Sequence, residues 1–186
     1  MVEATRQLVE EKGPDRFSVS DACRVAGVST AAPYRHFADR EEMLLEVVLA
    51  GMDRFYEALE SAHQPHPRGS LAAITALGHA YVDFAAREPG VFRLMFGLTQ
   101  RQGQNEVVRD RGMRVYGVLL HQIAAHFGHA SIDDHVQERA FPLWTFVHGL
   151  SFLLIDEKTD QLNLEVARTQ VVADATRRLL GTALAP

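Results

Sequence analysis

Apolar residues recur at three- and four-residue spacing along almost the whole chain, which is the pattern of amphipathic α-helices. Strand signals are absent, because no Asn-Gly or Asp-Gly pair separates runs of alternating apolar and polar residues. The clearest interruption is HQPHPRGS at residues 63–70, where two prolines and a glycine are incompatible with a helix interior. The pattern therefore predicts an all-α fold with a linker or tight turn over these residues.

Four helices are expected before this break, because capping and stop residues bracket the apolar periodicity. Ser18 and Asp39 are placed to cap two of them, and Gly27 can take the left-handed conformation at a helix end. If Ser29 caps the third helix, Pro33 is an early helical residue that costs at most one hydrogen bond, so the short helix is expected to survive. The expected ranges are 1–12, 19–26, 29–36 and 39–62.

Five further helical segments are expected after the break. Pro89 and Gly90 separate the first two of them, and Pro142 and Gly149 are expected to bend the fourth or to let another helix pack closely against it. The expected ranges are 70–87, 91–96, 105–127, 133–156 and 164–181.

Two short helices joined by a glycine-containing turn form a helix-turn-helix, and the run SVSDACRVAGVSTAAPYRHF fits that arrangement. Small and apolar residues stand where the two helices must touch, namely Val19, Ala22, Ala26, Val28 and Ala32. The N-terminal part of the second helix in such motifs meets base edges in the major groove of DNA. Thr30 can hydrogen-bond to a base and Ala31 can contact a thymine methyl group.

The run AGVSTAAPYRHFADREEMLLEVV resembles the DNA-binding domain of the TetR family over about the first third of the chain. The turn, the Tyr-x-His-Phe group and the acidic start of a long helix all fall at the family's spacing. The resemblance implies that Tyr34 and His36 contact phosphates, that Phe37 is a core residue, and that Arg40 contacts a phosphate where the family usually has lysine. The predicted DNA-contacting set is Ser18, Ser29, Thr30, Ala31, Ala32, Tyr34, Arg35, His36 and Arg40.

Without the flanking motif, the favoured interpretation of Tyr34 is a half-buried core aromatic and that of His36 is a helix C-cap; the motif favours phosphate contact instead. The family often carries a basic arm before its first helix, whereas this sequence begins almost at that helix. Either the arm is missing or the given start is not the natural one.

The C-terminal half carries a weaker resemblance to one TetR subgroup through EPGVFRLMFG and through PLWTFVHGLSFLL, which contains Trp144, His148 and Gly149. In the family this half forms a homodimer and encloses a pocket for a small molecule. Trp144 and His148 are four residues apart and share a helix face. The candidate ligand-binding residues are His79, Phe84, Phe92, Met95, Phe96, Tyr116, Leu120, Phe141, Trp144 and His148, although each of these types is also common in a plain core.

Dimerisation is expected to use the last two long helices, because each has a second apolar face that would mark an interface if exposed. These faces comprise Leu143, Val147, Leu150, Leu154, Val166, Val171, Ala175, Leu179 and Leu180.

Charge and composition limit the remaining possibilities. The net charge of −5 argues against a protein that coats nucleic acid, so DNA contact must come from a locally basic surface. Four arginines and a histidine stand close together with only two aspartates among them, a pattern that a solvated face also produces; they are Arg16, Arg24, Arg35, His36 and Arg40, with Asp21 and Asp39. The single cysteine excludes an intramolecular disulfide, and no apolar run approaches the length of a membrane span.

Neither a metal site nor a cofactor site nor an enzyme motif is predicted. The histidines at 121, 126, 129 and 135 lack the spacing of zinc ligands, and there is no phosphate loop or nucleophile elbow. The N-terminus is polar and acidic, unlike a signal peptide, so the cytoplasm is the expected location.

These observations predict a three-helix helix-turn-helix domain over residues 1–50, followed by a helical ligand-binding and dimerisation domain over residues 51–186. The expected function is a TetR-type repressor that binds a near-palindromic operator as a homodimer and is released by a small apolar or aromatic ligand. An activator or structural DNA binder of the same fold, a ligand-binding module without DNA binding, and a helical enzyme are the alternatives.

Overall fold

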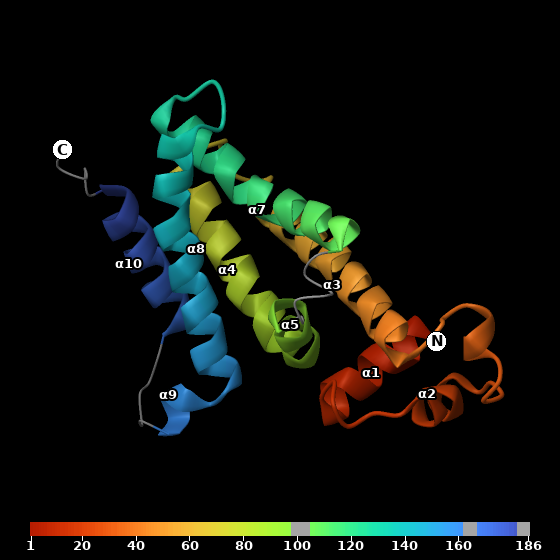
Figure 1. Ribbon diagram of the computed structural model, residues 1–186. Coiled ribbons are helices and arrows are strands. Elements are labelled where there is room, and N and C mark those ends of the chain that lie inside the picture. The colour runs from red at the N-terminus through yellow and green to blue at the C-terminus, as the bar shows by residue number, and fades with distance from the viewer. Residues whose placement is uncertain (98–104, 162–166, 182–186) are drawn as a thin grey trace. The chain divides into compact units, whose positions relative to one another are not determined.

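The computed structural model describes residues 1–97, 105–161 and 167–181 (Figure 1). Within these ranges all regular secondary structure is helical. The elements are α1 (Val2–Lys12), α2 (Val19–Ala26), η1 (Pro33–Arg35), α3 (Arg40–His63), α4 (Leu71–Arg87), α5 (Pro89–Phe96), α7 (Glu106–Phe127), α8 (Asp134–Ile155), α9 (Lys158–Gln161) and α10 (Arg168–Gly181). The all-α prediction is confirmed. Residues 164–166, expected to begin the last helix, lie outside the described residues, and the short helix α9 was not foreseen.

The chain divides into two compact units. The first comprises Met1–Arg54 and Glu88–Gly112, and the second comprises Phe55–Arg87 and Met113–Pro186. Helices α3 and α7 therefore each contribute residues to both units. The division of function at residue 50 stays a prediction.

Four helices begin where a short polar side chain accepts the backbone N–H three residues further on, at 2.9 to 3.1 Å. The capping residues are Ser18 for α2, Asp39 for α3, Ser70 for α4 and Asp133 for α8. Such a cap satisfies an N–H group that has no partner within the helix. The caps predicted at Ser18 and Asp39 are confirmed, and Gly27 ends α2 in the left-handed conformation with φ 67°.

The third helix of the prediction, residues 29–36, is wrong. The segment contains a turn followed by one turn of 3₁₀ helix, Pro33–Arg35. Pro33 has no N–H to give to the carbonyl of Ser29, and the N–H of Ala32 bonds to that carbonyl instead at 3.0 Å. An i-to-i+3 bond replaces the first α-helical bond, and the tighter 3₁₀ geometry follows.

In the first unit, α1 packs against α2 and α5. A Cβ atom on Gly90 would lie only 2.5 Å from the carbonyl oxygen of Val9, so the backbones of α1 and α5 touch at this point. The carboxylate of Glu10 accepts the N–H groups of Gly90 and Val91 at 2.7 and 2.9 Å. A side chain of α1 thus supplies the partners that the first N–H groups of α5 lack.

A second contact fixes the start of α5 in the first unit. Glu88 receives two hydrogen bonds from the guanidinium of Arg54, at 2.5 and 3.0 Å. Gly51 of α3 faces Val91, whose side chain would lie 2.6 Å from a Cβ atom at that position. Helices α1 and α3 therefore both hold the N-terminal end of α5.

In the second unit, α4 packs against α8 and α10, and α10 packs against α8. Gly78 permits this close approach, because a Cβ atom there would lie 2.7 Å from Val172 of α10 and 3.5 Å from Val147 of α8. A cluster of buried side chains fills the space between α4, α7, α8 and α10; it consists of Ile74, Leu120, Ile123, Ala124, Val136, Ala140, Leu143 and Leu180.

The prediction of which side of α8 forms the dimer interface is wrong, because most of the predicted side faces inward. Leu143, Val147 and Leu150 are only 5 to 9% exposed, so this stripe belongs to the core of the second unit. In α10, Leu180 is likewise buried, whereas the expected Val166 lies outside the described residues. A helix that is apolar on every side gives no sequence signal for which face turns inward.

Helix α8 has another apolar side, which is open. Phe141 and Leu153 are 57 and 49% exposed, and Thr145 and Gly149 lie between them at four-residue spacing. No Lys, Arg, Asp or Glu occurs between Arg139 and Asp156. Among the described residues, no helix combines the length and the apolarity needed to cross a membrane.

Candidate functional site

The start of α2 and the segment between α2 and α3 present most of the predicted DNA-contacting residues to solvent. The exposed members are Ser18, Ser29, Thr30, Ala31, Tyr34, Arg35 and His36. Tyr34 is 63% exposed, more than any other large apolar or aromatic side chain among the described residues. Pro33, directly before it, is buried, so the turn is attached to the unit through its proline while the tyrosine points outward.

The packing of this segment departs from the prediction in one place. Ala22 is fully buried as expected and Ala32 is half-buried, but Val28 is 42% exposed. Since residues 29–32 do not form a helix, Val28 has no second helix to pack against. Phe37, expected in the core, is half-buried.

Arg40 has hydrogen-bond partners within the protein. Its guanidinium donates to the carbonyl oxygens of Phe17, at 3.4 Å, and Pro14, and it lies 4.8 Å from the centre of the Phe17 ring. The side chain also bonds to Glu41 at 3.0 Å. Arg40 therefore ties the start of α3 to the loop before α2, and its phosphate contact stays a prediction.

The basic groups around the segment are partly balanced by Asp21. This carboxylate pairs with Arg24 at 3.0 Å and with Lys12 at 3.4 Å. Hydrogen bonding to Ser18, with the charge of Lys12, holds the pKa of Asp21 below its ordinary value. Arg16, Arg35 and His36 are exposed, as are Asp15 and Asp39, so a surface basic enough to bind DNA stays a prediction.

An aromatic cluster lies in the second unit, with Tyr81 buried and Trp144 and His148 half-buried. The indole N–H of Trp144 donates to the hydroxyl oxygen of Tyr81 at 3.3 Å, and that oxygen is 2.9 Å from Nδ1 of His148. An indole N–H can only donate, so the Tyr81 hydroxyl accepts from Trp144 and gives its own hydrogen to Nδ1. This network places the proton of a neutral His148 on Nε2, as inferred from the hydrogen bonds.

Burial shifts both titratable members of this cluster toward their neutral forms. Tyr81 is 6% exposed, and its burial raises the pKa of its hydroxyl far above the ordinary value. The pKa of His148 is lowered from 6.5 because its surroundings disfavour the charged ring. The cluster therefore combines aromatic rings with two hydrogen-bonding groups whose neutral forms are favoured.

The expectation that Trp144 and His148 share a helix face is confirmed, since their ring centres are 5.9 Å apart. Tyr81, which bonds to both, was missed, although it stands one turn from the predicted Phe84 on the same helix. A tyrosine within an otherwise apolar stripe was the available signal.

Two other predicted ligand residues lie beside the cluster. Tyr116 and Phe141 have ring centres 5.3 and 6.0 Å from that of Trp144. The remaining ones lie elsewhere in their units. His79 is 3.1 Å from the carbonyl of Thr169, Phe84 stacks on Phe55, and Leu120 is in the core cluster. Phe92, Met95 and Phe96 belong to the first unit.

Two family descriptions match this sequence. The family of bacterial regulatory proteins, tetR family, matches residues 1–47, and the tetracyclin repressor-like C-terminal domain matches residues 74–179. The uncharacterized HTH-type transcriptional regulator YobS of Bacillus subtilis (strain 168) is 22% identical over 157 residues, which are 84% of this chain and 78% of YobS. The two family matches fall on either side of the break at residues 63–70.

Solved structures share the fold over nearly the whole chain. A protein with unknown function from Rhodococcus sp. RHA1 superposes with a TM-score of 0.80 at 27% identity, covering 96% of this chain and 90% of that one. A TetR-family transcriptional regulator from Streptomyces coelicolor gives 0.73 at 13% identity, covering 97% and 79%.

Proposed function

The chain belongs to the TetR family of bacterial regulators, and from this premise we propose that it is a repressor that binds a near-palindromic operator as a homodimer and is released by a small apolar or aromatic ligand. Membership of the family makes it a DNA-binding transcriptional regulator rather than an enzyme. A repressor that acts on bacterial promoters works in the cytoplasm.

The exposure of Tyr34 carries the DNA-binding part of this proposal. A tyrosine that is 63% exposed, on a turn fixed by a buried proline and followed by Arg35 and His36, is placed for contact with a phosphate backbone. Thr30 and Ala31 are exposed beside it and carry the group types that read base edges. Ser18 is also part of the proposed DNA-contacting set, at the start of α2, where its side chain caps the helix.

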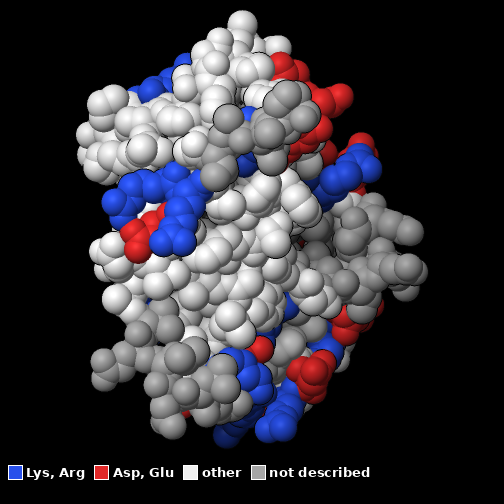
Figure 2. Space-filling model, turned by 90° about the vertical axis from the view of Figure 1, so that its left-hand side faces the viewer, with Lys and Arg blue, Asp and Glu red and all other residues white. Residues whose placement is uncertain are grey.

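The open side of α8 supports the homodimer. Figure 2 looks onto the side where α8 and α10 lie and shows a broad area without charged side chains, with charged groups around it. A Cβ atom on Gly149 would meet nothing within 4 Å, so a second helix can approach α8 closely at that point. On α10, Val171, Ala175 and Leu179 are half-buried. A second copy of the same face is the occupant we propose.

The aromatic cluster supports the ligand. Trp144 and His148, with Tyr81, combine apolar area with two neutral hydrogen-bonding groups, which is the composition of small-molecule sites. A ligand that prefers the form with lower operator affinity would shift the population toward that form.

The test is binding to the DNA upstream of the protein's own gene, followed by fluorescence anisotropy at several salt concentrations. We expect Tyr34→Ala to weaken binding without changing the slope of log affinity against log salt, because a neutral hydroxyl releases no counterion, whereas Arg35→Ala should reduce that slope by about one. Leu153→Asp should yield a monomer with much weaker affinity for the full operator. Leu71→Asp, at a leucine that is 42% exposed on another helix, should remain dimeric.

Several outcomes would change the proposal. If the protein binds DNA selectively but no compound in an aromatic panel weakens that binding, the proposed release by ligand is wrong. The protein would then be a DNA-binding regulator of another kind. Binding unaffected by Tyr34→Ala would remove the proposed reading surface. Absence of selective binding to any promoter would favour a ligand-binding module.

A further inference from the structure

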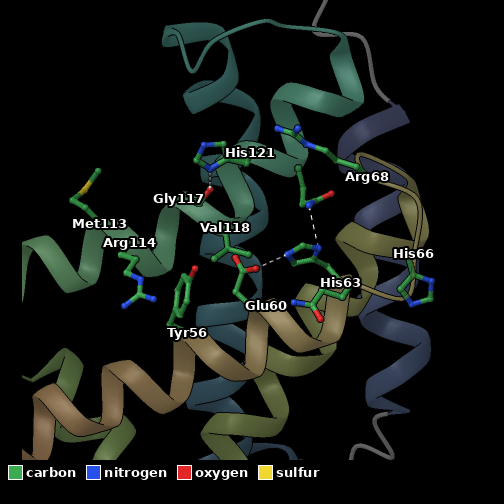
Figure 3. A pocket seen from close by; sticks show the side chains of 12 residues that line it. Tyr56, Glu60, His63, His66, Arg68, Met113, Arg114, Gly117, Val118 and His121 are labelled. Carbon is green, nitrogen blue, oxygen red and sulfur yellow. Dashed lines mark hydrogen bonds and ion pairs between the residues drawn. The ribbon is translucent and has the colours of Figure 1, made fainter.

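Besides the aromatic cluster, the second unit contains a separate hollow of about 570 Å³ between the C-terminal half of α3, the loop that follows it and the middle of α7. None of the predicted ligand residues lines it. Figure 3 shows its side chains, from Met113 and Arg114 on α7, past Tyr56 and Glu60 on α3, to the loop residues. Its volume is within the range of small-molecule sites.

We propose that this hollow binds an organic anion with a flat apolar body, such as an aromatic carboxylate. The apolar part would lie against Tyr56, Val118 and Met113. Val118 is 5% exposed and forms buried wall, while Met113 is 57% exposed and free to close over a bound molecule. Unbranched methionine side chains adapt readily to such surfaces.

Arg114 supplies the charge. Its guanidinium lies 3.7 Å from the centre of the Tyr56 ring. Stacking uses the flat face of a guanidinium and leaves its N–H groups at the edge, where they can form a fork with a carboxylate. Arg68 lies on the loop and is exposed, and among the described residues neither arginine has a carboxylate within ion-pair distance.

Three other polar side chains of the hollow, Gln122, His63 and Glu60, are linked to one another. Gly69 donates its N–H to Oε1 of Gln122 at 2.7 Å, and Nε2 of Gln122 lies 3.2 Å from Nδ1 of His63. His63 in turn lies 3.4 Å from the carboxylate of Glu60. These bonds engage the carboxylate of Glu60 within the wall. The hollow then has two arginines and one carboxylate among its charged side chains, which favours an anionic ligand.

Gly117 provides room for the ligand. A Cβ atom at this position would meet only Nδ1 of His121, at 4.0 Å, so the floor of the hollow is open above it. A larger side chain can therefore fill the hollow without displacing the protein. Gly112 on the same helix likewise has nothing within 4 Å and does not line the hollow, which makes it a matched control.

The experiment uses ¹³C-methyl methionine NMR with 2-naphthoate as the probe. Met113 is the reporter, because the ring current of a bound naphthalene would shift its methyl signal. The buried Met43, Met52 and Met95 report whether the first unit is unchanged, and the indole fluorescence of Trp144 reports on the second unit, which contains the hollow. At constant ionic strength we expect a saturable shift of the Met113 signal, and the neutral 2-naphthamide should bind about tenfold or more weakly.

Variants decide whether the shift arises in the hollow. Gly117→Leu should abolish it, Arg114→Met should weaken it about tenfold or more, and Gly112→Leu should leave it unchanged. The proposal is overturned if Met113 shows no saturable shift, if Gly117→Leu responds like the unaltered protein, or if the naphthamide binds as well as the naphthoate.

Discussion

Tyr34 and Tyr81 are the same side chain in opposite surroundings. Tyr34 is 63% exposed on the turn after α2, whereas Tyr81 is 6% exposed and bonds to Trp144 and His148. The fold gains little from Tyr34, so its position is open to selection for contact with a partner. Tyr81 is instead part of what specifies the interior of the second unit. The comparison separates a binding surface from a packed site, and the following substitutions test it.

The largest effect is expected at Tyr81. Tyr81→Ala removes a buried ring and should lower the free energy of unfolding by about 3–5 kcal/mol. Tyr81→Phe keeps the ring but leaves the Trp144 N–H without its acceptor and should cost about 1–3 kcal/mol. Tyr34→Ala should change the same quantity by no more than about 0.5 kcal/mol. Urea unfolding measures all three, and similar values at the two tyrosines would contradict the distinction.

The next effect is expected at Glu10, which stabilises the first unit through the start of α5 and lies away from the exposed turn that carries Tyr34. Glu10→Ala leaves the N–H groups of Gly90 and Val91 without their carboxylate and should cost about 1–3 kcal/mol. Glu11→Ala, one residue further on, removes only an exposed bond to Gln7 and is the control. Equal unfolding midpoints for the two variants would show that the carboxylate does not stabilise the start of α5.

The smallest effect is a pH dependence from His148. In the folded protein the pKa of His148 is lowered from 6.5. As the pH falls below about 6.5, the unfolded chain therefore binds a proton at this residue more readily than the folded protein does. The free energy of unfolding should fall with decreasing pH in that window, by less than about 1.4 kcal/mol per pH unit because solvent partly reaches the ring. His148→Gln should remove this component, and His66→Gln, at an exposed site, should not. Unfolding curves from pH 7.5 to 5 that are equally steep for both variants would contradict the assignment.

The helix boundaries were predictable where a local signal sets them. Ser18 and Asp39 cap helices through bonds to residues three positions away, and Gly27 ends α2 by its own conformation. Pro33 shows the limit of such reasoning. Counting lost hydrogen bonds allowed the helix to continue, but the loss falls on the first turn, where there are few other bonds to offset it.

The orientation of α8 and the membership of the aromatic cluster required the tertiary structure. Every side of α8 is apolar after Arg139, so periodicity cannot select the buried one; the close approach permitted by Gly78 of α4 selects it. The spacing of Trp144 and His148 did predict that they meet. Their common partner Tyr81 lies 63 positions or more away in sequence, and no local pattern connects them.

The sole cysteine of the chain lies on the inner side of α2 and is 1% exposed. A thiol reagent can reach it only when α2 separates from its neighbours. The labelling rate of the native protein therefore measures how often the first unit opens locally around α2. Comparing that rate with and without DNA would give the free energy by which a bound operator closes this unit, without any engineered probe.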